Sequence, residues 1–259
     1  MKPKIILTFD LEEFDLPLEY NCPISEELQF ETSNEGLHKL IQLLAQHKVR
    51  ATFFTTGNFC EKYPGTIKSL SENHEIASHA YYHSQFDTEY IIRSKQILEA
   101  TSGKQVKGFR MPLFQKVDYE NLREAGYRYD SSVNPTFLPG RYNNFNVSRT
   151  PYKITSSEII ELPLSVSPVI RFPLSWFSFK NLPLIIFRLF CNSVIRHDEY
   201  LHLYFHPWEF ADLDSFKIPG YIKKPSGKKY IKKFDELLFY LSKKGEFVTV
   251  SEFLESYIF

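Results

Sequence analysis

The feature that most constrains the fold of this chain is a repeated alternation of short apolar runs with longer runs of helical periodicity. Residues 4–9 predict a buried strand, and the apolar residues of 37–44 then recur at helical spacing, with Ser33 or Asn34 as the cap of that helix. Residues 64–73 predict another helix, and residues 134–152, rich in Pro, Gly and Asn, predict a long loop. The pattern then continues to a final predicted helix that begins at Ser251. Such alternation is typical of α/β folds with parallel strands. We therefore expect about seven strands, with helices between them, in an irregular barrel.

Size and charge limit the classes of protein to which the chain can belong. It has 259 residues, of which 43% are hydrophobic, and this is enough for one large domain with its own core. The length also permits two domains, but no linker, repeat or low-complexity segment divides the chain, so one domain over residues 1–259 is the simplest interpretation. The 31 basic and 31 acidic residues cancel, whereas a general nucleic-acid binder carries a basic surplus. We therefore expect no nucleic-acid partner.

The cysteines and the apolar segments of the sequence indicate in which cellular compartment the protein occurs. The cysteines, Cys22, Cys60 and Cys191, have no paired spacing and fit a reducing compartment. No apolar segment of signal-peptide type follows the N-terminus, and no uninterrupted apolar run reaches the roughly 18 residues of a membrane span. The nearest candidate, residues 166–195, is broken by basic residues and prolines. We therefore expect a cytoplasmic protein.

Two histidines and an acidic cluster carry the strongest chemical signal. His79 and His83 follow the predicted strand 75–78, and their spacing of four would put them one turn apart on a helix. The acidic cluster, residues 10–13, follows the first predicted strand. Two imidazoles and one carboxylate are the ligand set of a catalytic divalent metal, usually zinc. Taken alone, the histidines also fit a surface helix and the acids a solvated turn.

Three further polar residues end predicted strands: Arg110, Asp130 and His206. An arginine can hold a carboxylate bidentately and keep it ionised, and an aspartate bonded to a histidine raises the basicity of the imidazole, as a general acid near neutral pH needs. The alternatives are a surface salt bridge for Arg110 and a structural role for His206. Because strand ends of a barrel share one rim, these residues and the metal set together predict a metal-dependent hydrolase.

The order of these motifs resembles the polysaccharide deacetylase family, the NodB-homology domain of carbohydrate esterase family four. The matching segments are Thr8 to Asp10, Ser78 to His83, Arg110 to Pro112, Tyr129 to Ser132 and Phe205 to Glu209. The last two are most similar to a bacterial branch associated with exopolysaccharide and surface-glycan clusters. The resemblance implies an α/β fold, specifically a distorted (β/α)₇ barrel of mostly parallel strands. It also implies a divalent metal and the removal of N- or O-acetyl groups from sugars.

The resemblance implies a role for each catalytic position. Asp10 matches the general base, and Arg110 matches the arginine that orients this base. His206 matches the general acid, and Asp130 matches the partner of that acid. The backbone N–H of Leu113, just past the Arg-x-Pro motif, would help to hold the oxyanion.

The metal ligands implied by the resemblance include one departure from the family pattern. His79 and His83 match the two histidine ligands. The commonest first motif has two adjacent aspartates, the second of which binds metal, and here Leu11 occupies that position. Some branches space the acids one residue apart, so we assign Glu12 as the third ligand. Ala80 replaces a common glycine. We expect zinc, with cobalt, manganese or nickel as alternatives.

The sequence leaves several interpretations open. The resemblance implies an acetylated glycan as substrate, with Trp208 on the substrate side of the site. Alternatives are a carbon–nitrogen hydrolase acting on a small cyclic amide or ureide, and a non-catalytic glycan-binding descendant. Aromatic and aliphatic residues of 176–179 and 184–187 would allow peripheral membrane contact, but a buried loop and helix is the favoured explanation, because most such runs are core. The oligomeric state stays open.

Overall fold

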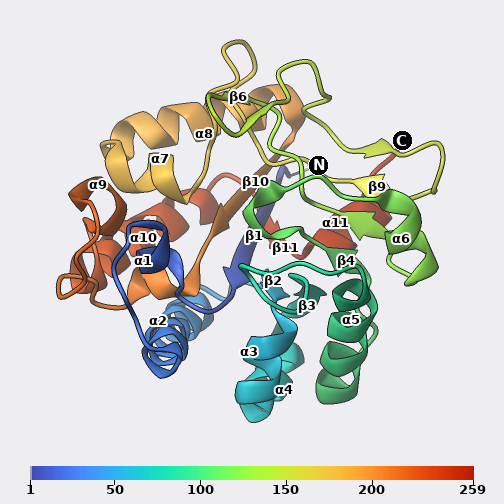
Figure 1. The fold of residues 1–259 in the computed structure, drawn as a ribbon. Coiled ribbons are helices and arrows are strands. Elements are labelled where there is room, and N and C mark those ends of the chain that lie inside the picture. The colour runs from blue at the N-terminus through green and yellow to red at the C-terminus, as the bar shows by residue number, and fades with distance from the viewer. Residues whose placement is uncertain (1) are drawn as a thin grey trace.

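The computed structural model describes residues 2–259, and in this part of the chain a nine-stranded sheet organises the fold (Figure 1). The strands of this sheet are β1 (Lys4–Leu11), β2 (Thr52–Thr55), β3 (Glu75–Ser78), β4 (Gly108–Phe109), β5 (Tyr129–Asp130), β8 (Tyr152–Lys153), β9 (Ile160–Glu161), β10 (Tyr200–Phe205) and β11 (Glu246–Val248). Seven of them pair in parallel in the order β10-β1-β2-β3-β4-β5-β9. β11 also pairs in parallel with β1, and β8 is antiparallel to β9. The expected α/β fold of mostly parallel strands is confirmed.

Helices surround the central strands, with α2 to α5 below and α7, α8 and α10 at the left of Figure 1. The helices are α1 (Leu16–Glu19), α2 (Glu26–Gln46), α3 (Gly57–Lys62), α4 (Pro64–Asn73), α5 (Glu89–Ser102), α6 (Tyr119–Glu124), α7 (Trp176–Asn181), α8 (Leu184–Asp198), α9 (Gly220–Lys223), α10 (Gly227–Ser242) and α11 (Val250–Ser256). Two 3₁₀ turns, η1 (Pro112–Phe114) and η2 (Pro207–Phe210), follow β4 and β10 at the carboxyl ends of these strands.

The barrel is distorted where its two outer parallel strands approach each other. In the described residues β9 and β10 form no ladder with each other, but the Ser165 N–H, just past β9, donates to the His202 carbonyl of β10 at 3.1 Å. An isolated bridge joins Ser175 to Tyr204. The sheet therefore curls into a partial barrel whose last gap is spanned by single contacts instead of a continuous ladder.

Because β1 is pleated, the side chains on one of its faces point into the hydrophobic core and those on the other face point into the barrel interior. β1 is buried from Ile5 to Leu11, as expected for a strand covered on both faces. Alternate residues, from Ile5 to Leu11, join the large hydrophobic core. Because successive side chains point to opposite faces, Thr8 and Asp10 point into the barrel. Leu11 therefore belongs to the core, and the next residue on the site's side is Glu12.

Three local expectations are wrong. The first long helix begins at Glu26 and is capped by Ser25, whose hydroxyl accepts from the Leu28 N–H at 3.3 Å. The expected caps, Ser33 and Asn34, lie inside that helix because buried Phe30 extends its apolar face toward the N-terminus. The predicted loop 134–152 contains a short hairpin, β6 (Phe137–Leu138) with β7 (Tyr142–Asn143). The third error concerns the histidine pair and is described with the site.

The apolar segment 166–195 is partly core and partly surface. Phe179 and Phe187 are fully buried, whereas Ile185 and Leu189 on α8 are exposed by 68% and 60%. The structure thus buries two of the aromatic residues, whereas Phe177, exposed by 42%, and an aliphatic strip of α8 lie at the surface. Among residues 2–259, none of the helices combines the length and the apolar character required to span a bilayer.

Candidate metal and catalytic site

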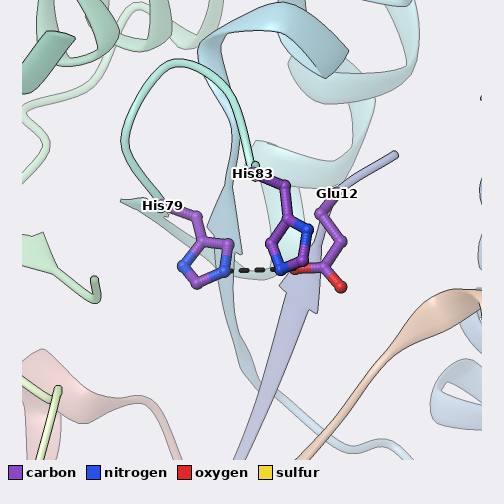
Figure 2. Close-up of side chains that lie close together, drawn as sticks. All are labelled: Glu12, His79 and His83. Carbon is purple, nitrogen blue, oxygen red and sulfur yellow. Dashed lines mark hydrogen bonds and ion pairs between the residues drawn. The ribbon is translucent and has the colours of Figure 1, made fainter. Parts of the chain in front are cut away.

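Glu12, His79 and His83 meet at the carboxyl end of the sheet (Figure 2). Glu12 follows β1, and His79 follows β3, two strands along the sheet. Glu12 Oε2 lies 3.1 Å from His79 Nε2 and 3.3 Å from His83 Nε2. All three side chains are at least nine-tenths buried. The residues that the sequence suggested as ligands therefore converge on one point.

The two histidines lie on a loop, so the expectation of a helix is wrong. Ala80 adopts a left-handed backbone with φ 57°, which interrupts any helix directly after His79. The loop is held by the Gly57 and Asn58 N–H groups, which donate to the carbonyls of Ala80 and Tyr81 at 3.0 and 2.9 Å. A left-handed alanine costs roughly 1 kcal/mol, whereas glycine would adopt this conformation freely. The three residues between the histidines therefore form a turn that brings His83 back beside His79.

Each histidine is oriented through the ring nitrogen that faces away from Glu12. His79 Nδ1 donates to the Arg110 carbonyl at 2.8 Å, and His83 Nδ1 donates to Asp15 Oδ1 at 2.8 Å. These bonds direct the Nε2 atom of each ring toward Glu12, where both would serve as ligand atoms. Metal-binding histidines usually have such a partner on their second nitrogen.

The donor atoms fit a small divalent cation. Ligands on a tetrahedron around zinc, at roughly 2.0–2.1 Å from the ion, lie about 3.3 Å apart, close to the separations seen here. Burial alone would raise the pKa of Glu12, but the positive charges of His83, His206 and His79 lower this pKa to about 2. Burial would lower the pKa of His83, yet the charges of Glu12 and Asp15 raise it to about 10. Glu12 and the histidines therefore pair as opposite charges, and a divalent cation would bind here in exchange for the imidazole protons.

Asp10 lies beside the three donors and is held by Arg110. Arg110 Nη1 donates to Asp10 Oδ1 at 2.6 Å, and both side chains are almost completely buried. The same guanidinium donates to Thr8 Oγ1 at 3.1 Å and to the Ser131 carbonyl at 2.9 Å. With all this support, Asp10 has a fixed orientation and its second oxygen, Oδ2, is turned toward the site.

His202 is a further member of the Arg110 network. The His202 ring on β10 is completely buried. Its Nδ1 donates to the Pro163 carbonyl at 3.1 Å, and its Nε2 accepts from Arg110 Nη2 at 3.3 Å. Burial and the charge of Arg110 lower the pKa of His202 to about 3, so its ring is neutral.

His206 faces the ligand set from the opposite side. His206 Nε2 lies 3.8 Å from Glu12 Oε1 and 4.0 Å from Asp10 Oδ2. Trp208 stacks on the His206 ring with centroids 4.8 Å apart, and its indole N–H donates to Glu12 Oε1 at 3.3 Å. Burial would lower the pKa of His206, but the nearby charges of Glu12, Glu209 and Asp10 raise it.

The expected pairing of Asp130 with His206 is wrong. The carboxylate that contacts His206 Nδ1 is Glu209, at 3.1 Å. Asp130 instead accepts from Ser132 Oγ at 2.7 Å and lies opposite Glu161 on the neighbouring strand β9. Burial and the charge of Asp130 raise the pKa of Glu161 well above its usual range. The strand end of β5 therefore carries its own buried acid pair, out of contact with the histidine.

A cavity of about 80 Å³ opens onto these groups. Asp10, His206 and Leu113 line it, and Trp208 lies in its wall. Leu113 and Phe114 both have left-handed backbones, with φ 57° and 53°. Such consecutive strained residues are common where backbone groups face a functional site. The structure thus brings together every residue that the sequence proposed for the site except Asp130.

Sequence reasoning missed two residues that contact the site's histidines. Asp15, the partner of His83, follows the acidic cluster by only two residues, but nothing in the sequence shows that the chain turns back there. Glu209 was visible inside the His-Pro-Trp-Glu motif without a role. Its spacing of three from His206 is that of a capping pair, and the His206 N–H does donate to Glu209 Oε1 at 2.8 Å.

Comparison with protein families divides the chain into two matched segments. Residues 1–129 match the polysaccharide deacetylase family model, and residues 131–255 match a domain of unknown function, DUF3473. A peptidoglycan-N-acetylglucosamine deacetylase of Bacillus cereus is 37% identical over 82 residues, which are 29% of this chain and 30% of that protein. Other curated relatives also match over only 25–38% of their length.

Solved structures share the fold over almost the whole chain. A Mycobacterium smegmatis protein assigned to the polysaccharide deacetylases superimposes with a TM-score of 0.67 at 19% identity, covering 98% of this chain and 90% of that one. PuuE allantoinase gives a TM-score of 0.67 at 14% identity, covering 97% and 89%. A pseudoenzyme of carbohydrate esterase family four from Bacillus anthracis gives 0.55 at 14%, covering 98% and 66%. On its motifs, its fold and the match of its first 129 residues, this chain belongs to the polysaccharide deacetylase family.

Proposed function

We propose that this protein is a metal-dependent hydrolase that removes acetyl groups from the nitrogen of an N-acetylated sugar in a glycan. The observation that carries the proposal is the convergence of Glu12, His79 and His83, with donor atoms 3.1 and 3.3 Å apart, beside Asp10 and His206. The B. cereus relative, a peptidoglycan-N-acetylglucosamine deacetylase, supports a sugar substrate.

Glu12, His79 and His83 would hold the cation, which we propose to be zinc, with cobalt, manganese or nickel as alternatives. When bound, such a cation polarises an acyl carbonyl and lowers the pKa of a water molecule. The fit of the site to a cation is supported by the donor spacing and by the partners on both Nδ1 atoms. The departure at residue 11 does not remove the third ligand, because Leu11 faces the core and Glu12 faces the site.

Asp10 and His206, which lie on opposite sides of the proposed ligands, would each carry out one of the two proton transfers. Asp10, held in place by Arg110, would take the proton from the attacking water. His206 would give a proton to the leaving nitrogen from the other side of the cavity. The Leu113 N–H would stabilise the negative charge that develops on the carbonyl oxygen. Removing a general acid typically costs 10²–10⁴-fold in rate, so we expect His206→Ala to lower turnover by roughly that factor.

The test combines elemental analysis with acetate release. The purified wild type is expected to contain about one equivalent of divalent metal and to release acetate from at least one member of a panel of N-acetylated glycans. The double variant His79→Ala, His83→Ala should lose both properties. A matched control, His38→Ala, changes an exposed histidine of α2 and should keep both. Wild-type metal content in the double variant would contradict the ligand assignment.

Two alternatives use the same fold and are separated by the same assay once cyclic amides and ureides are added to the panel. The likeness to PuuE allantoinase favours a cyclic amide or ureide as the second candidate substrate, and ring-opened product without acetate release would establish it. The likeness to a pseudoenzyme favours a glycan-binding descendant without activity. Bound metal together with glycan binding, but without product from any substrate, would identify that case.

A further inference from the structure

A buried ion pair behind His206 is not explained by the family motifs. Glu209 is fully buried, and its Oε1 accepts from both the backbone N–H and the Nδ1 of His206, at 2.8 and 3.1 Å. Its Oε2 accepts a hydrogen bond from the Tyr230 hydroxyl, which comes from α10. Three donors therefore fix this carboxylate, and two of them belong to the histidine that faces the site.

Lys180 supplies the balancing charge. Its ammonium lies 3.9 Å from Glu209 Oε2, is fully buried, and has no hydrogen-bond partner in residues 2–259. It lies over the rings of Tyr230, Trp208 and Trp176 at 5.0, 5.6 and 5.8 Å. Burial lowers the pKa of Lys180 to about 8, so the ammonium is the main form at pH 7. A buried cation without a hydrogen-bond partner is costly unless an anion and aromatic faces stabilise it.

We propose that Glu209 is the positioning residue for His206, with Lys180 as its counter-charge, in place of the aspartate at the end of β5. Glu209 fixes the proton on Nδ1 of His206 and aims Nε2 into the cavity, where a leaving group would be protonated. Tyr230 holds the carboxylate by a hydrogen bond, and Lys180 lies beside it as the opposite charge. This inference rests on the proposed function of His206 and extends it to residues of α7, η2 and α10.

The kinetic test compares two leaving groups in the metal-loaded protein. Glu209→Gln keeps the shape of the side chain and removes its charge. We expect it to lower turnover of the N-acetylated glycan on the order of 10–100-fold, less than the loss of His206 itself. Turnover of 4-nitrophenyl acetate should fall much less, because a nitrophenolate leaves without a proton. Metal content should stay at the wild-type level, since Glu209 contacts none of the proposed ligands. Equal losses with both substrates would overturn the proposal.

A second variant separates positioning from folding. Glu209→Gln leaves Lys180 as an unpaired buried charge, so its thermal unfolding midpoint should fall. The double variant Glu209→Gln, Lys180→Met removes both charges and should regain stability without regaining glycan turnover. Recovery of both stability and turnover would show that Glu209 has only a structural role.

A spectroscopic measurement keeps this inference distinct from the proposed function. Histidine-selective ¹⁵N NMR of the wild type should show a protected ring N–H on Nδ1 of His206, identified by its loss in His206→Gln. Glu209→Ala should abolish that protection. If the signal behaves in this way but no glycan releases acetate, the positioning by Glu209 stands and the proposed reaction fails. If Nδ1 of His206 carries no protected proton in the wild type, the positioning itself is wrong.

Discussion

At the scale of single residues, the orientation of each proposed histidine ligand is fixed by a hydrogen bond on its Nδ1, the ring nitrogen that faces away from Glu12. Asp15 is the clearest case, because it contacts His83 Nδ1 at 2.8 Å and is itself nearly buried. Such partners typically contribute a factor of about 10–100 in metal affinity. We therefore expect Asp15→Ala to weaken zinc affinity by roughly that factor. Titration against a competing chelator measures the change.

The control for Asp15 is Glu19→Ala, which removes an acid from the rim of the same cavity. Glu19 contacts Arg141 at 3.8 Å and its side chain is 39% exposed, so its loss changes the local charge without freeing a histidine ring. Equal loss of affinity in both variants would mean that general charge, and not the orientation of His83, accounts for the effect.

His202 should make stability depend on pH through its buried neutral ring. Its pKa is about 3 in the folded protein and 6.5 in the unfolded reference, so between these values only the unfolded chain takes up the proton. The contribution of His202 is fully present above pH 6.5 and is lost progressively as pH falls toward 3. The slope attributable to this residue approaches about 1.4 kcal/mol per pH unit within that window.

Urea unfolding at several pH values from neutral to acid measures this slope. His202→Asn keeps a donor for the Pro163 carbonyl but cannot be protonated, and its free energy of unfolding should vary less with pH than that of the wild type. His197→Asn, at an exposed position on α8, is the control and should keep the wild-type slope. Identical slopes in all three proteins would exclude His202 as the source.

The predicted site residues that the structure brings together share a simple physical basis. Asp10, His79, Arg110 and His206 each end or directly follow a parallel strand, and the carboxyl ends of such strands meet at one rim whatever the details of packing. The partner of His206 could not be found in this way, because it depends on which acid reaches Nδ1. The turn after His206 places Glu209 against Nδ1, whereas Asp130 is hydrogen-bonded to Ser132.

At the scale of elements, strands were easier to predict than the segments that follow them. β3 and α4 have the predicted bounds, because a doubly buried run and a proline at the first helical turn are local signals. The loop that carries His83 was predicted as a helix, because spacing alone cannot distinguish a helical turn from a loop with one left-handed residue. The left-handed φ of Ala80 produces the loop instead of the helix, and this conformation cannot be predicted from an alanine in the sequence.

The contact between α2 and η2 should be unusually sensitive to side-chain size. A Cβ on Gly36 would lie 2.0 Å from the Pro207 carbonyl oxygen and 2.8 Å from its carbon. Because η2 carries the residues that follow His206, Gly36→Ala must displace the turn. We expect a loss of about 1–3 kcal/mol in the free energy of unfolding, which is typical of overpacking, together with lower glycan turnover.

The matched control is Gly65→Ala in α4, where an added Cβ would meet nothing within 4 Å. This change should be neutral or stabilise the protein by up to about 1 kcal/mol, because alanine favours helix. Urea unfolding of the two variants gives both numbers. A Gly36→Ala protein as stable as Gly65→Ala would show that α2 and η2 can separate at little cost.

At the scale of the whole molecule, the two segments matched by different family models share one sheet. β1 of the first segment lies between β2 on one side and β10 on the other, and it also pairs with β11. Both β10 and β11 belong to the second segment. The proposed site is divided in the same way, since His206 follows β10 whereas the three metal donors follow strands of the first segment. We therefore propose that residues 1–259 fold as one unit and not as two.

A fragment of residues 1–130 should consequently fail to fold. It would expose β1 along one edge and remove the α8 and α10 side of the core, so an apolar strand edge would be open to aggregation. We expect no cooperative transition by circular dichroism and rapid digestion by protease. The control is the complete chain cut once at residues 139–140, in the exposed tip between β6 and β7, which breaks the chain but removes no strand. The nicked protein should stay folded and keep its metal. A cooperative transition in the fragment would mean that the first segment is a domain by itself, and that the second segment only completes its site.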